Sequence, residues 1–378
     1  MGNFSSAERC VSSGEESTPL TGTAEASGRA SAVFCLAGST AAREKTMRKP
    51  LFLLLLTIVS ALASPAQAKP EYVPGRGLRF FDGQLVLGGY LAADLAFMDE
   101  SRDQLILDDV SAFLTYNPTD ELEFFTEFEI EDGLHLDGHG FGTGEDVTQL
   151  ERLYLEYRPF DDLSIRVGKV LTPIGIWNPI HAAPLVWTTS RPFATNAFFD
   201  THLTGLQIEG RRQIGALDLV ANLFGQATNQ LDKSDVRQRM RRGGGGRIQI
   251  GNFDHWHVAG SYLRFQDDRD RKWKHVAGID VLFENDDWEI TTESVLSARA
   301  GHQTEWSTYL QVVYHLGKFH PVVRYEHVEF QHLSRNPMTF GVAYKPLPNM
   351  VIKLEGVVGR RDFEKGARGV LMSFSVLF

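Results

Sequence analysis

Residues 121–131 read Glu-Leu-Glu-Phe-Phe-Thr-Glu-Phe-Glu-Ile-Glu, and apolar and acidic side chains alternate through most of this stretch. Successive side chains of a β-strand point to opposite faces, so a period of two residues separates two unlike faces. The stretch therefore predicts a strand with one apolar face and one charged face. The two faces hold Leu122, Phe124, Phe128 and Ile130 on one side and Glu123, Glu127, Glu129 and Glu131 on the other.

The same alternation recurs along the chain from residue 84 to the C-terminus, for example in 163–168, 275–284 and 370–378. No convincing amphipathic helix interrupts it. The pattern predicts sixteen strands, at about 84–97, 104–117, 120–131, 148–158, 162–171, 203–212, 216–228, 245–251, 255–266, 273–284, 287–298, 303–316, 319–330, 336–345, 349–358 and 367–378.

The connections between these segments alternate in length. Short connections such as 117–120 and 158–162 take turns with longer ones such as 132–147, 172–201 and 229–244. Transmembrane barrels have short periplasmic turns and long external loops. Lipid offers no hydrogen-bond partners, so a sheet with an apolar outer face must close and leave no edge. We therefore predict an all-β, antiparallel transmembrane barrel of about 16 strands over residues 84–378, wide enough to hold a water-filled channel.

Aromatic residues cluster near the predicted strand ends, where membrane barrels carry aromatic girdles at both interfaces. We expect these residues to face the bilayer interface. They are Tyr154, Tyr157, Trp273, Trp288, Trp306, Tyr309, Tyr314, Tyr325 and Tyr344.

Composition narrows the class of protein. The 378 residues include 38 Lys and Arg against 48 Asp and Glu, a formal net charge of −10, and 23% of residues are charged. That charge content excludes a polytopic helical membrane protein, and an acidic chain argues against nucleic-acid binding. A soluble β-sandwich or β-propeller would also show alternating apolar and polar residues. A propeller should also show a sequence repeat of the length of one blade, and none is visible.

The N-terminal residues indicate export. Arg48 and Lys49 precede an apolar run at 51–62, which is too short to span a bilayer, and Ala66-Gln67-Ala68 follows it. These parts make a secretory signal peptide at residues 47–68, cleaved near Ala68. Met47 is then the expected initiator, residues 1–46 an over-long and disordered N-terminal extension, and residues 69–83 a short segment before the barrel. Both cysteines, Cys10 and Cys35, fall in the extension, so no cysteine-based metal site is expected downstream.

Two stretches carry a family resemblance. The final strand ends in Phe374-Ser375-Val376-Leu377-Phe378, which resembles the C-terminal sorting signature of Gram-negative outer-membrane barrels. Residues 153–178, with Leu153–Arg158, Leu163–Gly168 and a Pro173-Ile174-Gly175 segment, are similar to a strand–turn–strand region of the phosphate-selective porin O and P family. The resemblance implies a trimeric porin in the outer membrane of a Gram-negative bacterium.

Strand parity predicts which side chains line the channel. The loop 172–201 contains four prolines and few charges besides Arg191, and a loop of this length is usually functional. We expect it to fold inward and narrow the channel beside Arg152 and Arg166, as the third external loop does in the porins this chain resembles. The predicted pore-lining and constriction residues are Arg152, Arg166, Glu123, Glu127, Glu129, Arg191, Arg324 and Glu326.

A second loop, 229–246, is basic and glycine-rich. Clustered cations outside the membrane attract anionic solutes or the phosphates of lipopolysaccharide, although a solvated flexible loop is the alternative. The predicted external basic loop contains Lys233, Arg237, Arg239, Arg241 and Arg242.

No catalytic, cofactor or metal site is predicted. His255 and His257 share a strand face, but two ligands are fewer than the three or four that zinc usually takes. Residues near the predicted rims, namely Asp99, Asp200, His202, His302 and His332, show no serine-hydrolase motif.

The sequence thus predicts an outer-membrane porin for passive diffusion of small hydrophilic solutes or ions, with anions such as phosphate as the selective variant. Its partners would be outer-membrane lipid, lipopolysaccharide and the permeating solutes. A barrel hydrolase, an adhesin and an export barrel are the alternatives.

Overall fold

The computed structural model describes residues 69–98, 103–137, 140–143, 148–180, 182–228, 231, 239–359 and 368–378. The predicted extension 1–46 and signal peptide 47–68 lie outside the described residues. Among the residues described, no helix is long and apolar enough to cross a membrane.

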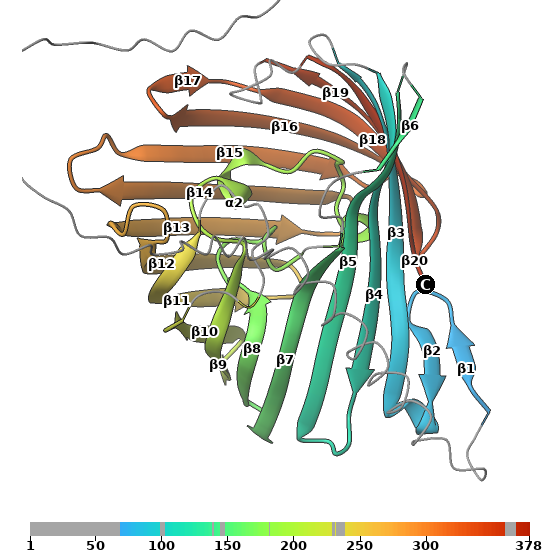
Figure 1. Ribbon diagram of the computed structural model, residues 1–378, viewed down its shortest axis with the longest axis vertical. Coiled ribbons are helices and arrows are strands. Elements are labelled where there is room, and N and C mark those ends of the chain that lie inside the picture. Colours follow the sequence, from blue (N-terminus) through green and yellow to red (C-terminus); the bar gives the residue numbers. More distant parts are fainter. Residues whose placement is uncertain are drawn as a thin grey trace, which may run out of the picture. The chain divides into compact units, whose positions relative to one another are not determined.

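Sixteen long antiparallel strands form one closed sheet, in which each strand pairs with the next and the last pairs with the first (Figure 1). The predicted sixteen-stranded barrel is confirmed. The first eight strands are β3 (Leu85–Met98), β4 (Gln104–Tyr116), β5 (Leu122–Asp137), β7 (Thr148–Phe160), β8 (Leu163–Leu171), β9 (His202–Ile214), β10 (Leu217–Gln226) and β11 (Met240–Asn252). The other eight are β12 (Trp256–Asp267), β13 (Trp273–Glu284), β14 (Trp288–Arg299), β15 (Glu305–Tyr314), β16 (Phe319–Phe330), β18 (Met338–Leu347), β19 (Met350–Val358) and β20 (Gly369–Leu377).

Short elements complete the described chain. The segment before the barrel, predicted at 69–83, forms a small hairpin whose second strand pairs with β3. The short elements are β1 (Glu71–Val73), β2 (Gly77–Phe80), the 3₁₀ turn η2 (Phe81–Gly83), β6 (Gly140–Gly142), the 3₁₀ turn η3 (Ala183–Leu185), α2 (Phe193–Asn196) and β17 (Leu333–Arg335).

The connections sort by length between the two ends of the barrel. Tight connections such as 161–162 and 215–216 lie at one end, here called the short-turn end. Longer ones such as 172–201 and 331–337 leave from the other, here called the long-loop end.

Closure depends on the C-terminal strand. β20 pairs with β3 along nine residues, from Gly369 opposite Met98 to Leu377 opposite Tyr90. The terminal residue continues the ladder, because the Phe378 N–H donates to the Gly89 carbonyl at 2.8 Å and the Gly89 N–H donates back at 3.0 Å. The sheet therefore has no unpaired edge between its first and last long strands.

Strand β16 shows how alternation produces two unlike faces. Val323 and Tyr325 are each 45% exposed on the outer face, whereas Arg324 and Glu326 are 0% and 1% exposed on the inner face. Leu223 of β10, Ile248 of β11 and other apolar side chains of the long strands are likewise exposed on the outside. A barrel with an apolar exterior and a polar interior is the arrangement that a membrane-spanning sheet requires.

Strand β11 begins earlier than predicted. Arg241, Arg242 and the glycines 243–246, expected in an external loop, lie within the strand; the glycines pair with both β10 and β12, and Arg242 pairs with β12. Glycine lacks a side chain, so residues 243–246 show no alternation of apolar and polar side chains from which a strand could be predicted. The glycines are needed for close packing, since a Cβ on Gly243 would lie 2.6 Å from Phe265 Cβ.

The expected aromatic girdle is wrong at two positions. Tyr309 is 2% exposed and faces inward, where its hydroxyl donates to Glu293 at 2.6 Å, and Tyr154 stacks on Phe125 inside the barrel. Whether an aromatic side chain points into or out of the barrel depends on its place in the two-residue alternation, and not on its distance from a strand end. Outward aromatics do pair near the short-turn end, as in Trp288 with Tyr314 and Phe319 with Tyr344.

Substituting Gly245 by alanine should destabilise the barrel, because the added Cβ would lie 2.1 Å from the Tyr262 carbonyl oxygen and 2.9 Å from Phe224. Overpacking of this kind costs about 1–3 kcal/mol. Urea unfolding in detergent, followed by tryptophan fluorescence, measures the change. Gly260→Ala is the matched control, since its Cβ would meet no atom within 4 Å; equal stability of the two variants would contradict the packing argument.

Candidate functional site

Residues 172–201, here called the inner segment, connect β8 to β9, and their described parts, 172–180 and 182–201, lie against the inner wall of the barrel. Trp177, Phe193 and Phe198 of this segment are only 4%, 6% and 1% exposed. Such apolar side chains gain by leaving water and packing on apolar wall residues. The cluster they form contains Val170, Ile174, Trp177, Val186, Phe193, Ala194, Ala197, Phe198, Phe199, Leu203, Phe224, Met240, Leu263, Phe265, Val276, Val295, Tyr309, Val328 and Phe330.

Carboxylates of the wall bind the backbone of the inner segment. Glu355 accepts hydrogen bonds from the backbone N–H groups of Thr189 and Ser190, both at 3.0 Å. Glu326 accepts one from Phe193 at 2.7 Å. A segment without a ladder partner would otherwise bury unpaired N–H groups, which is costly. The acidic residues on the inner faces of β16 and β19 therefore hold this connection in the lumen.

Glu293 of β14 makes a third anchor of the same kind. It accepts a hydrogen bond from the Trp177 N–H at 3.2 Å. Gly175 lies close to the same carboxylate and has a φ of +71°. A Cβ at this position would lie 2.0 Å from Glu293 Oε2, so no larger residue fits here. Glycine adopts this backbone conformation without steric cost. This explains the glycine of the Pro173-Ile174-Gly175 motif.

Two wall cations complete the anchoring by donating to carbonyl groups. Arg324 donates to the Ser190 carbonyl at 2.9 Å and pairs with Glu326 at 3.0 Å, while Lys353 donates to the Ala183 carbonyl at 2.8 Å. Arg324 and Glu326, predicted to line the channel, thus lie on the inner wall but are covered by the inner segment.

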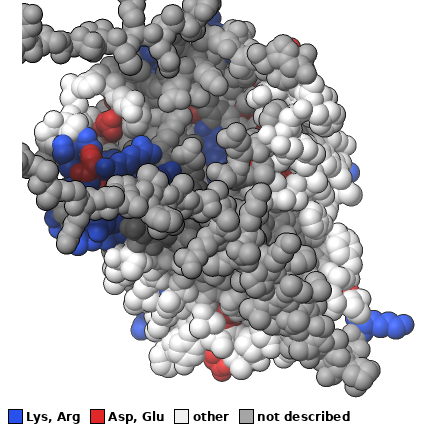
Figure 2. Space-filling model, viewed as in Figure 1, with Lys and Arg blue, Asp and Glu red and all other residues white. Residues whose placement is uncertain are grey.

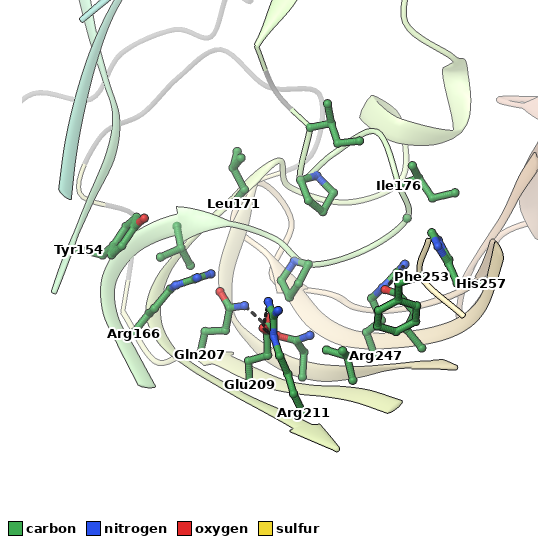
Figure 3. A pocket seen from close by; sticks show the side chains of 18 of the residues that line it. Tyr154, Arg166, Leu171, Ile176, Gln207, Glu209, Arg211, Arg247, Phe253 and His257 are labelled. Atoms are coloured by element: carbon green, nitrogen blue, oxygen red, sulfur yellow. Dashed lines mark hydrogen bonds and ion pairs between the residues drawn. The ribbon is translucent and has the colours of Figure 1, made fainter. Parts of the chain in front are cut away.

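A cavity of about 370 Å³ lies between the inner segment and the wall from β7 to β12 (Figure 3). Its lining combines polar side chains of the strands with apolar ones of the segment. The lining residues are Arg152, Tyr154, Arg166, Val170, Leu171, Pro173, Gly175, Ile176, Pro179, Ile180, Gln207, Glu209, Arg211, Val220, Asn222, Arg247, Gln249, Phe253 and His257. The structure thus brings the predicted residues Arg152 and Arg166 together, and adds Arg211 and Arg247.

The charges around this cavity are arranged in layers. Arg152 and Arg166 keep 24% and 29% of their side chains exposed, whereas their partners Glu127 and Glu156 keep 0% and 4%. Arg211 is 68% exposed against 13% for its partner, Glu209. The guanidinium groups of Arg152 and Arg166 stand between their carboxylate partners and the cavity, whereas Glu209 lines the cavity beside Arg211. More cationic than anionic side chains therefore face this space, although most of the charges are paired.

A fourth arginine, Arg247, also lies between its acidic partner and the cavity, deeper in the wall. Arg247 pairs with Asp280 through two hydrogen bonds, at 2.5 and 2.7 Å, and the carboxylate does not line the cavity. Four arginines and one carboxylate, that of Glu209, therefore line this space (Figure 3). Parity predicted Arg152 and Arg166 as inward, but no sequence pattern showed that their partners Glu127 and Glu156 would be shielded.

The other predicted channel residues lie on nearby strands. Glu123 pairs with Arg158 at 2.7 Å, and Glu127 and Glu129 accept hydrogen bonds from Ser111 and Tyr90 at 2.6 and 2.5 Å. These contacts tie β3, β4, β5 and β7 together. Arg191 is carried by the inner segment, and its charge acts on Asp109 of β4.

Of the predicted external basic loop, Arg239 precedes β11, while Lys233 and Arg237 lie outside the described residues. Figure 2 shows that Lys and Arg side chains gather near the long-loop ends of β11 to β14. At the β12–β13 connection, Arg271 pairs with Asp268 at 3.1 Å and Arg299 pairs with Asp270. These arginines were not predicted as part of a basic surface, because the connection mixes acidic and basic residues.

The candidate hydrolase residues have structural partners. His202 pairs with Glu151 at 2.6 Å, and both are buried. Asp200 accepts a hydrogen bond from the Met240 N–H at 2.7 Å. These groups join the base of the inner segment to β7 and β11.

The chain matches no family model and no curated protein. Its fold is similar to solved outer-membrane structures. These include OmpF of Salmonella typhi, in complex with daunomycin (TM-score 0.57, 11% identity, covering 82% of this chain and 99% of that one). They also include the trimer form of OmpT from Vibrio cholerae (TM-score 0.54, 12% identity, covering 78% of this chain and 99% of that one). A third is an anion-selective porin from Comamonas acidovorans (TM-score 0.55, 10% identity, covering 78% of this chain and 99% of that one). At these identities the likeness shows a shared fold.

Replacing Glu355 by alanine should loosen the inner segment, because two backbone N–H groups lose their acceptor. A loss of about 1.4 kcal/mol in local stability raises the population of the opened segment about tenfold. Chymotrypsin cleavage at Trp187, Phe193 or Phe198, timed by mass spectrometry, measures this opening. The control is Glu329→Ala, which removes an acid of the outer face paired with His327; equal cleavage of both variants would show that Glu355 is no anchor.

Proposed function

We propose that this chain forms a passive, water-filled channel for small hydrophilic solutes or ions across the outer membrane of a Gram-negative bacterium. The proposal is supported by the closed sheet, its apolar outer face and its charged inner face. A barrel of sixteen strands is wide enough for an aqueous path. The proposal needs no cofactor and no covalent chemistry.

The inner segment would set the width of the path. It carries apolar bulk into the lumen and is held against β14, β16 and β19 by the glutamates described above. Solutes would then pass on the side of Arg152 and Arg166, beside the cavity.

Selectivity for anions, with phosphate as one candidate, is the finer part of the proposal. The order of charges beside the cavity supports anion selectivity, because the arginine side chains are more exposed than their partners Glu127, Glu156 and Asp280. Basic rings in a narrow lumen favour anions. The similar fold of the anion-selective porin from Comamonas acidovorans is consistent with this choice.

Export would follow signal cleavage near Ala68, and the basic long-loop end would face lipopolysaccharide phosphates. Assembly as a homotrimer is part of the proposal, because the OmpT structure of similar fold is a trimer form.

Planar-bilayer recording of the purified protein tests the proposal directly. We expect stepwise conductance and, in a potassium chloride gradient, a reversal potential that favours chloride. No conductance would overturn the channel, while conductance with cation preference would overturn only the anion selectivity.

The double variant Arg166→Gln/Arg211→Gln should reduce the chloride-to-potassium permeability ratio by roughly two- to tenfold, since it removes two cations from the water-facing layer. Reversal potentials at low salt measure the ratio. Lys318→Gln removes one exposed cation from the β15–β16 turn and should leave the ratio unchanged. An unaltered permeability ratio in the double variant would show that these arginines do not act on the permeating ions.

A further inference from the structure

We propose that an inward-facing cluster at the short-turn end, formed by Glu284, Glu289 and His315, binds a first-row divalent cation such as Zn²⁺. One ligand atom from each of these residues lies within 4.8 Å of the others. Carboxylate oxygen and imidazole nitrogen together suit zinc and its neighbours, and a bound water can complete a four-coordinate site.

The strand register places these three residues together. Glu284 ends β13 and stands directly opposite Glu289 of β14. His315 follows β15, and its backbone N–H donates to the Asp287 carbonyl at 2.7 Å, beside the start of β14. Like charges directly opposite each other on neighbouring strands are destabilising. A divalent cation between the two carboxylates would offset this repulsion.

Two neighbours hold the candidate ligands in place. His320 Nδ1 lies 2.9 Å from His315 Nδ1, a contact in which one ring donates and the other accepts. The Trp187 indole N–H donates to Glu289 Oε2 at 2.7 Å, and its ring lies against both histidines, with centroids 5.4 and 4.7 Å apart. Metal ligands are usually oriented by such outer hydrogen bonds. The inner segment, which carries Trp187, would thus cover the bound ion.

Lys345 is the cation that opposes metal binding here. Its Nζ lies 3.9 Å from the centre of the Trp187 ring, and its charge acts on both Glu289 and Glu284. Within the described chain, it forms an ion pair with neither carboxylate. Lys345 would therefore weaken the negative field of the site.

Isothermal titration of tag-free, detergent-solubilised protein with zinc chloride tests the site, independently of any conductance. We expect one Zn²⁺ per chain, and a loss of affinity of about tenfold or more in both His315→Ala and Glu289→Gln. His332→Ala is the matched control at the long-loop end, where His332 contacts Gln303. It should bind like the wild type. Equal affinity of wild type and His315→Ala, or an equal loss in His332→Ala, would overturn the site.

Two further measurements guard against variants that fail to fold. Unheated samples run on a detergent gel should show the mobility of the folded barrel for every variant compared. Lys345→Met should bind Zn²⁺ several-fold more tightly, because it removes a repelling charge while leaving the ligands intact. Affinity that is unchanged or weaker in this variant would contradict the assignment of the carboxylates as ligands.

Discussion

The whole structure depends on the hydrogen bonding of a backbone whose outer side chains are apolar. Where lipid replaces water, each unpaired N–H or C=O costs several kcal/mol, and only a sheet without an edge avoids that cost. The pairing of β20 with β3, extended by the mutual hydrogen bonds of Gly89 and Phe378, removes the edge here. Closure then creates an interior, and every second side chain of each strand must be accommodated in it.

The same constraint explains the inner segment. A connection that enters the lumen has no ladder of its own, so its backbone must find other partners. Glu293, Glu326 and Glu355 accept from it, and Arg324 and Lys353 donate to it. Buried charge on the wall of β14 to β19 is therefore used for structure. The side chains of Arg152, Arg166 and Arg211 beside the cavity are more exposed than their acidic partners.

The strands were predictable because alternation is a local property of the sequence. Residues 121–131 display it directly, and the length of 172–201 marked that connection as special. The early start of β11 was hidden, because glycines 243–246 carry no side chains to alternate. The inward direction of Tyr309 follows from parity, which its place near a strand end obscured. The shielding of Glu127 behind Arg152 was beyond prediction, since it depends on contacts between β5 and β7 and on their relative burial. The cluster of Glu284, Glu289 and His315 joins β13, β14 and the residue after β15, so it forms no motif along the sequence.

Closure of the sheet between its first and last long strands is tested most directly by a cross-strand disulfide. Ala92 of β3 and Ser375 of β20 are direct partners in the register, and opposed Cα atoms of antiparallel strands lie about 4.5–5.5 Å apart, within the range a disulfide spans. The measurement is oxidation of Ala92→Cys/Ser375→Cys in a chain whose Cys10 and Cys35 are replaced by serine. A closed sheet should give an intramolecular disulfide in the folded, detergent-solubilised protein. A pair that stays reduced, or that joins only separate chains, would contradict a closed barrel.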